Sequence, residues 1–171
     1  MKFSMSKRFL LFLAVPAFFL FMPGCSQTEF QEMSDTEILE LLSQVVAGEE
    51  ALEEAGQQYF LGLSNENKNI IVPSALHERL SNNEPVMVLD IRRAEDFARG
   101  HIEGAVNIWW FDVGHHLDEL PRDRSLLVTC YSGQAAGQVV GVLRMMGFEA
   151  VSLAGGMNGG WLSAGLPVVT E

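Results

Sequence analysis

Cysteine is scarce in this sequence. The 171 residues contain two cysteines, Cys25 and Cys130. Two thiols allow at most one bridge, so a disulfide framework is excluded as the main source of stability. If Cys25 is modified, Cys130 has no partner, and a lone thiol in an oxidising compartment is a liability unless it is buried or used. Before its neighbours are considered, Cys130 fits a small buried hydrophobe as well as a reactive group.

Basic residues are also few. Lysine and arginine together number 11, against 22 aspartates and glutamates, which gives a formal net charge of −11. Three of the cations, Lys2, Lys7 and Arg8, precede the first apolar run, so removal of this segment would leave 11 − 3 = 8 cations and a charge of 8 − 22 = −14. Such a chain repels nucleic acid and anionic lipid. Attachment to a membrane would therefore have to come from an anchor.

One long apolar run is present, at residues 9–21, and it is too short to cross a membrane comfortably. A basic start precedes it and Pro23-Gly24-Cys25 follows it, which is the layout of an export signal. The cysteine at its end resembles the bacterial lipobox, which implies cleavage before Cys25 and lipidation of its thiol. Ordinary signal cleavage and an uncleaved anchor are the alternatives. We therefore expect a signal peptide at 1–24, a tether at 25–33, and an exported protein that is a membrane-anchored lipoprotein or periplasmic.

The next segment is predicted to be a helical extension, at 34–69, before a single domain at 70–171. Ser34 followed by Glu37 predicts a capping box, and apolar residues then recur at helical spacing to about residue 61. Gly48 is expected to divide the segment into two helices. We expect the apolar face to pack on the domain, with a spacer or partner-binding helix as the alternative.

Short apolar runs then alternate with helical or loop segments. The expected strands are residues 70–72, 86–89, 105–108, 126–129 and 150–153, and the expected intervening segments are 74–80, 94–99, 112–120 and 134–146. The runs at 86 and 126 are apolar without alternation, as in strands covered on both faces. Strands and helices in alternation predict an α/β fold with a parallel sheet. In such sheets the chemistry lies at the carboxyl ends of the strands.

Cys130 directly follows one of these strands, and a helix is expected shortly after it. A loop that leaves a strand and enters a helix turns several backbone N–H groups inward, and the helix dipole adds positive partial charge there. Gly133 could adopt the left-handed backbone angle that lets these amides converge. The local sequence therefore favours a stabilised thiolate at Cys130.

Three segments resemble the signatures of rhodanese domains. They are residues 88–108 with Gly100-His101-Ile102, the loop Thr129-Cys130-Tyr131-Ser132-Gly133, and residues 153–168 with Gly155-Gly156 and Trp161. The resemblance implies a rhodanese-like five-stranded parallel sheet with helices on both faces. It also implies a sulfurtransferase that moves sulfane sulfur from a donor such as thiosulfate or polysulfide to cyanide, a small thiol or a protein thiol.

By the same resemblance, Cys130 is the nucleophile and carries the sulfur as a persulfide, with no metal or organic cofactor. The expected anion-binding loop comprises Tyr131, Ser132, Gly133, Gln134 and Ala135. Family loops often carry an arginine near their end, whereas residues 134–136 here are Gln-Ala-Ala. The loop therefore supplies no cation for a sulfonate, which counts against efficient use of thiosulfate.

Other polar residues have mainly structural interpretations. Asp90 and Arg92 could support the site by binding an anion, although a structural ion pair is favoured. His101 is expected to make turn-locking hydrogen bonds. A metal at His115 and His116 is disfavoured, because neighbours on a helix point in different directions.

Two other functions are alternatives. Phosphatases of the same fold need an arginine six residues after the cysteine, where this chain has Ala136. The stronger alternative is a non-catalytic rhodanese-like module that binds or senses a partner at the cell envelope with an idle cysteine.

Overall fold

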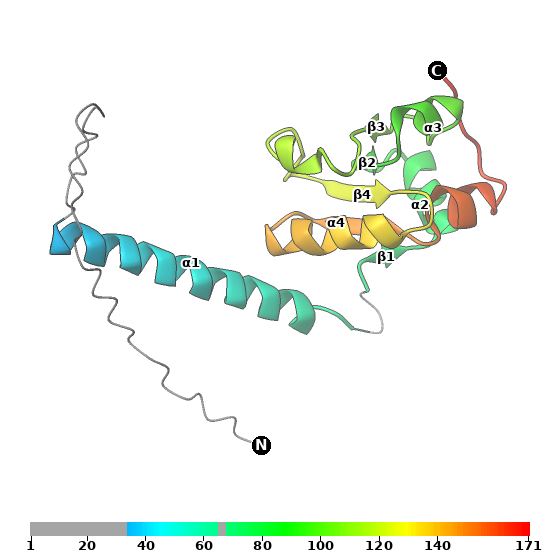
Figure 1. Ribbon diagram of the computed structural model, residues 1–171. Helices are drawn as coiled ribbons and strands as arrows, with labels where there is room; N and C mark the ends of the chain where they lie inside the picture. The colour runs from blue at the N-terminus through cyan, green and yellow to red at the C-terminus, as the bar shows by residue number, and fades with distance from the viewer. Residues whose placement is uncertain (1–33, 65–67) are drawn as a thin grey trace, which may run out of the picture.

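The structure is a computed structural model that describes residues 34–64 and 68–171. The predicted signal peptide at 1–24, the lipid attachment site Cys25 and the tether at 25–33 lie outside the described residues. The remainder forms a long helix followed by a sheet with helices packed on it (Figure 1).

Five parallel strands form the sheet, in the order β1-β5-β4-β2-β3. Their bounds are β1 Ile70–Ile71, β2 Val86–Asp90, β3 Val106–Asn107, β4 Ser125–Thr129 and β5 Ala150–Leu153. The central pair β2 and β4 is in register from Val86 opposite Ser125 to Asp90 opposite Thr129. All five strands were predicted, and the two outer ones are shorter than expected.

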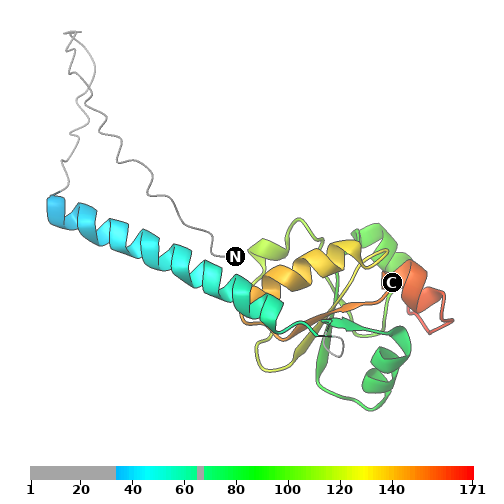
Figure 2. The same ribbon diagram turned by 90° about the horizontal axis from the view of Figure 1, so that it is seen from below.

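Alternate residues of the strands enter two separate apolar clusters, one on each face of the sheet. Val88, Leu127 and Leu153 face a cluster with Leu76, Met157 and Trp161. Leu89, Leu126 and Val128 face the other, together with residues 140, 143 and 148. Because both faces are buried, the strand sequences are apolar without alternation. The predicted α/β class, with a five-stranded parallel sheet and helices on both faces, is confirmed (Figure 2).

The helices of the domain lie where they were predicted, and two other segments differ from a regular α-helix. The bounds of the helices are α2 Pro73–Ser81, α3 Ala94–Arg99 and α4 Gln134–Met145. The first of the two segments, 112–120, was expected to be helix or loop, and it consists of turns with the 3-10 helix η1, Val113–His115. The amides of His115, His116 and Glu119 each bond three residues back, in successive tight turns. The second difference is a π-helix, η2 at Gly156–Leu162, which the sequence analysis did not predict.

Helix α1, Asp35–Leu61, projects away from the domain for most of its length (Figures 1 and 2). It is continuous, so the expected break at Gly48 is wrong. None of its residues, all of which the structure describes, is buried, which contradicts the expected packing of its apolar face. Only its last turns reach the domain, where Gly56 lies near Met145 and Tyr59 near Gly141. Within 34–64 and 68–171, no helix is both long and apolar enough to cross a membrane.

The strand order places a crevice between the carboxyl ends of β2 and β4. After β2 the chain turns towards the β3 edge, and after β4 it passes through α4 towards β5 on the other side. Two neighbouring parallel strands whose connections diverge in this way leave a gap at their carboxyl ends, where α/β proteins bind ligands. Residues 91–93 leave one side of this gap and Cys130 leaves the other.

Candidate active site

Cys130 is the first residue after β4, and 3% of its surface is exposed. On one side it belongs to the apolar cluster that contains Ile91, Ala136 and Val140. On the other side its Sγ accepts hydrogen bonds from the backbone amides of Gly133, at 3.1 Å, and Ala136, at 3.4 Å. The sulfur is therefore aimed at converging backbone donors.

The start of α4 produces this convergence. Gly133 caps the helix with φ 90°, in the left-handed region that glycine adopts without strain. Ala136 lies in the first turn of α4, where a backbone amide has no partner within the helix, and its N–H points to Cys130 instead. The positive end of a 12-residue helix thus faces the sulfur.

The amides that donate to Cys130 lie only partly within the predicted anion-binding loop, residues 131–135. Gly133 lies within the predicted range, whereas Ala136 lies one residue beyond it. The side chains of Ser132 and Gln134 are exposed at the surface of the loop, and Ala135 is half-buried. The amide of Ala136 was missed because the prediction ended the cradle at the loop, although first-turn amides of a helix also lack partners.

A second segment, within the signature at 153–168, supports the loop through backbone hydrogen bonds. The amide of Met157 donates to the carbonyl of Cys130 at 2.7 Å, and that of Asn158 donates to the carbonyl of Tyr131 at 2.9 Å. Gly156 has φ 59°, and a Cβ there would lie 2.5 Å from the Cys130 carbonyl oxygen and 2.7 Å from the Gly133 amide. The adjacent glycines at 155 and 156 were the sequence signal for this close approach.

Tyr131 ties the loop to α3. Its hydroxyl donates to Asp96 at 2.5 Å and accepts from the backbone N–H of Arg93 at 3.3 Å. Burial and the bond to Asp96 raise the pKa of Tyr131, while the same bond, followed by the charges of Arg99 and Arg92, lowers the pKa of Asp96. The pair is therefore a neutral phenol bonded to a carboxylate across a wide range around neutral pH.

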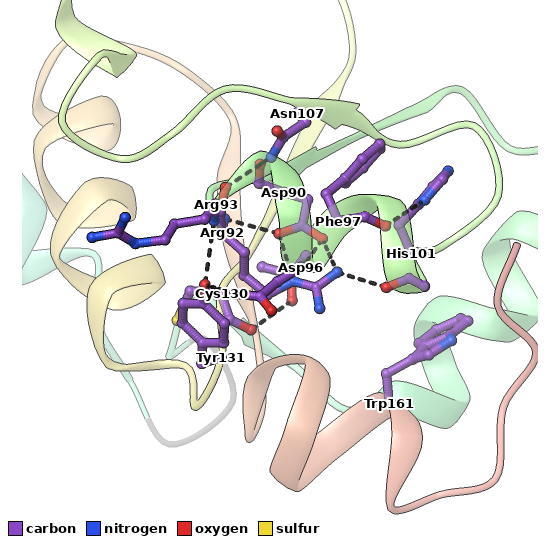
Figure 3. Close-up of polar contacts among 12 residues, drawn as sticks. Asp90, Arg92, Arg93, Asp96, Phe97, His101, Asn107, Cys130, Tyr131 and Trp161 are labelled. Carbon is purple, nitrogen blue, oxygen red and sulfur yellow. Dashed lines mark hydrogen bonds and ion pairs between the residues drawn. The ribbon is translucent and has the colours of Figure 1, made fainter. Parts of the chain in front are cut away.

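Asp90 and Arg92 form a buried ion pair at the end of β2, as favoured from the sequence (Figure 3). Arg92 binds both carboxylate oxygens, with its Nη2 2.6 Å from Asp90, and also donates to the Gly100 carbonyl at 2.8 Å. Asn107 donates to the carbonyls of Asp90 and Arg92. All of the guanidinium contacts are internal to the fold, so the pair fixes the turn that leads to Arg93.

A cavity of about 250 Å³ opens beside Tyr131. Its walls come from the turn after β2, from α3, from η2 and from the C-terminal segment. The lining residues are Arg92, Asp96, Arg99, Gly100, Tyr131, Asn158, Leu162 and Val168. The space next to the loop is thus large enough for a small polar molecule.

The histidines take no part in this site. His101 is buried, its Nδ1 lies 2.9 Å from the Phe97 carbonyl oxygen, and its ring stacks on that of Phe97 at 3.7 Å. These contacts are the turn-locking ones expected. His116 pairs with Glu119 at the surface. Within the part of the chain that the structure describes, no three His, Cys, Asp or Glu side chains gather as metal ligands would.

Comparison with known proteins agrees with this geometry. The rhodanese-like domain family matches residues 72–163, more than half of the chain. A sulfurtransferase from Allochromatium vinosum is 32% identical over 102 residues, which cover 59% of this chain and 94% of that protein. Thiosulfate sulfurtransferase GlpE from Glaesserella parasuis is 33% identical over 99 residues, which cover 57% of this chain and 90% of the relative.

Solved structures of rhodanese-related proteins are similar to this fold. A rhodanese-related protein from Thermoplasma volcanium has a TM-score of 0.55 and 29% identity, covering 59% of this chain and 97% of its own. A thiosulfate sulfurtransferase from Pseudomonas aeruginosa has a TM-score of 0.52 and 29% identity, covering 59% of this chain and 19% of its own. The family match begins at residue 72, so α1 lies outside it. The chain belongs to the rhodanese-like domain family, and its relatives from Allochromatium vinosum, Glaesserella parasuis and Pseudomonas aeruginosa are sulfurtransferases.

Proposed function

We propose that this protein transfers sulfane sulfur through a persulfide on Cys130. The observation that carries the proposal is the pair of backbone amides, from Gly133 and Ala136, that point at Sγ at the positive end of α4. Donors fixed in advance around a sulfur stabilise an anion there, and both the attacking thiolate and the product persulfide are anions.

The reaction balances without a cofactor. The Cys130 thiolate attacks the outer sulfur of a donor such as thiosulfate, a new S–S bond forms, and the donor S–S bond breaks so that sulfite leaves with the electron pair. An acceptor then takes the outer sulfur, as cyanide does in forming thiocyanate, or a small or protein thiol does in forming its own persulfide. In both steps the negative charge stays next to the amides of Gly133 and Ala136.

Intact mass measurement tests this proposal directly. The full chain is incubated with thiosulfate or polysulfide, freed of excess donor, and weighed without reductant. We expect a gain of about 32 Da, one sulfur atom, which cyanide or dithiothreitol reverses. Cys130→Ser should lose the adduct, and the matched variant Cys25→Ser should keep it. A chain with an intact Cys130 and no such adduct would instead support a non-catalytic binding module.

We also propose that the protein is exported and is held at a membrane through a lipid on Cys25. The supporting observations are those of the sequence: a basic start, the apolar run at 9–21 and the cysteine that ends the segment. Cys25→Ala is expected to move the protein from the membrane fraction to the soluble fraction, whereas Cys130→Ala should not. Unchanged retention of Cys25→Ala at the membrane would contradict the anchor.

A further inference from the structure

The loop around Cys130 lacks a cation that could bind an anionic sulfur donor. A thiolate that attacks thiosulfate brings a negative charge towards a dianion, and a nearby cation offsets that repulsion. Residues 134–136 of the loop are Gln-Ala-Ala and supply no cation. The arginines that form ion pairs with carboxylates within the described residues are Arg79, Arg92, Arg99 and Arg124.

Arg93 is an exception among the cations close to the loop. Within the described residues it forms no ion pair, and its side chain is exposed. Its neighbour Arg92 turns inward to Asp90, whereas the Arg93 side chain extends in the opposite direction, away from that pair (Figure 3). Two consecutive arginines therefore differ in role, one closing the turn and the other leaving its charge unneutralised.

Backbone contacts place Arg93 at the edge of the crevice. The amide of Ile91 donates to the Thr129 carbonyl at 2.9 Å, so the chain after β2 runs beside Cys130. Two residues on, the amide of Arg93 donates to the Tyr131 hydroxyl at 3.3 Å. Arg93 and Cys130 thus leave adjacent strands on opposite sides of the same gap.

An aromatic ring supports the Arg93 guanidinium. Its Cζ lies 4.9 Å from the ring centroid of Trp109, and that ring meets Phe111 edge-on at 4.6 Å. A guanidinium held over an aromatic face keeps its in-plane N–H donors free to bind an anion in a two-point contact. The charge is therefore held against the Trp109 ring without being neutralised.

We propose that Arg93, held by Trp109, is the docking group for a small anionic sulfur donor, of the thiosulfate or thiosulfonate class. This inference rests on the proposed sulfur transfer at Cys130. Arg93 supplies from the turn after β2 the cation that the loop lacks. It binds the oxyanion end of the donor while the outer sulfur faces Cys130, and the sulfite that leaves remains next to the guanidinium.

Alkylation with a charged and a neutral reagent tests the inference independently of sulfur transfer. The rates of modification of Cys130 by iodoacetate, an anion, and by iodoacetamide, which is neutral, are measured on the full chain by mass spectrometry of the peptide that contains Cys130. Arg93→Ala should lower the iodoacetate rate by about three- to tenfold, with a smaller loss at high salt, and leave the iodoacetamide rate unchanged. Arg124→Ala, which removes an equal charge at the amino end of β4, should change neither rate.

Thiosulfate kinetics give the second measurement. Arg93→Ala should raise the KM for thiosulfate several-fold with a smaller change in kcat, and Arg93→Lys should recover part of the loss, because it restores the charge without the two-point contact. Equal iodoacetate to iodoacetamide ratios in the wild type and Arg93→Ala would overturn the role of Arg93. Absence of the persulfide from every variant would instead reject the proposed function, so the two failures are distinguishable.

Discussion

The domain that contains the sheet and helix α1 are stabilised by different means. Two buried clusters and a five-stranded sheet hold the domain, and their contacts join residues far apart in the sequence. Helix α1 buries none of its residues, carries seven carboxylates and no cation, and is supported by a capping box and its own backbone bonds. Substitutions in the domain should therefore alter both the free energy of unfolding and the active site. The effects of substitutions in α1 should be confined to that helix.

The largest expected effect comes from the buried ion pair of the domain. Asp90→Asn removes the charge that compensates Arg92, whose side chain is 4% exposed and has no other carboxylate contact within the described residues. Breaking such a pair costs about 3–5 kcal/mol. Urea unfolding should show a large fall in the midpoint. Glu50→Gln, an equal change of charge on the exposed surface of α1, should leave it unchanged.

If Asp90→Asn unfolded with the wild-type midpoint, the ion pair would not hold the turn after β2. Because the turn after β2 positions Arg93, this variant should then also keep the hydrogen bond from the Arg93 amide to the Tyr131 hydroxyl. A fall in the midpoint for Glu50→Gln would show instead that α1 and the domain are energetically coupled.

Substitution of two glycines, Gly156 in η2 and Gly48 in α1, should change stability by smaller amounts and in opposite directions. Gly156→Ala places a methyl group 2.5 Å from the Cys130 carbonyl oxygen at a φ of 59°, so the loop must move. We expect a loss of about 1–3 kcal/mol in the free energy of unfolding, together with slower formation of the persulfide. Gly48→Ala meets nothing within 4 Å and removes a poor helix former, so α1 should gain about 0.5–1 kcal/mol of helix stability.

Thermal unfolding followed by circular dichroism, with the persulfide assay alongside, separates these two outcomes. Gly156→Ala with normal stability and a normal rate of persulfide formation would mean that η2 does not hold the loop. An effect of Gly48→Ala on the rate would mean that α1 influences the active site.

The same contrast explains what the sequence could predict. All five strands and helices α2, α3 and α4 were predicted. Apolar runs mark buried strands and glycines mark helix ends, and both signals can be read from the local sequence. The position of Cys130 directly after an apolar strand was also predicted. The amide of Ala136, the support from Gly156 and the bond from Tyr131 to Asp96 were missed, because each depends on how separate segments meet in space.

The wrong prediction for α1 and the open one for residues 112–120 have a related cause. Apolar periodicity in α1 predicted packing on the domain, but periodicity shows only which side chains share a face, not whether a partner covers them. For residues 112–120 the sequence left helix and loop open, and the segment closes hydrogen bonds three residues apart around Gly114. In both places the result depends on the surroundings and not on the local pattern.

The smallest expected effect concerns the start of α1. Ser34 caps the helix and binds Glu37, and the bonds from Ser34, first from its backbone amide and then from its hydroxyl, lower the pKa of Glu37. A lowered pKa in the folded state means that this stabilisation is present above the ordinary pKa of about 4.3 and is lost as pH falls through the folded value. Ser34→Ala should therefore return the Glu37 pKa towards its ordinary value and fray the first turn, at a cost of about 1 kcal/mol of helix stability.

Amide exchange in the first turn of α1 and an NMR titration of Glu37 measure this change, with Ser43→Ala, an exposed serine within α1, as the matched control. Because the first turn of α1 lies at the end of the helix that points away from the domain (Figures 1 and 2), the melting temperature of the domain should stay the same in both variants. A domain that melted earlier in Ser34→Ala would contradict the independence of the two regions, since a local loss at one end of α1 would then have travelled through its last turns to α4.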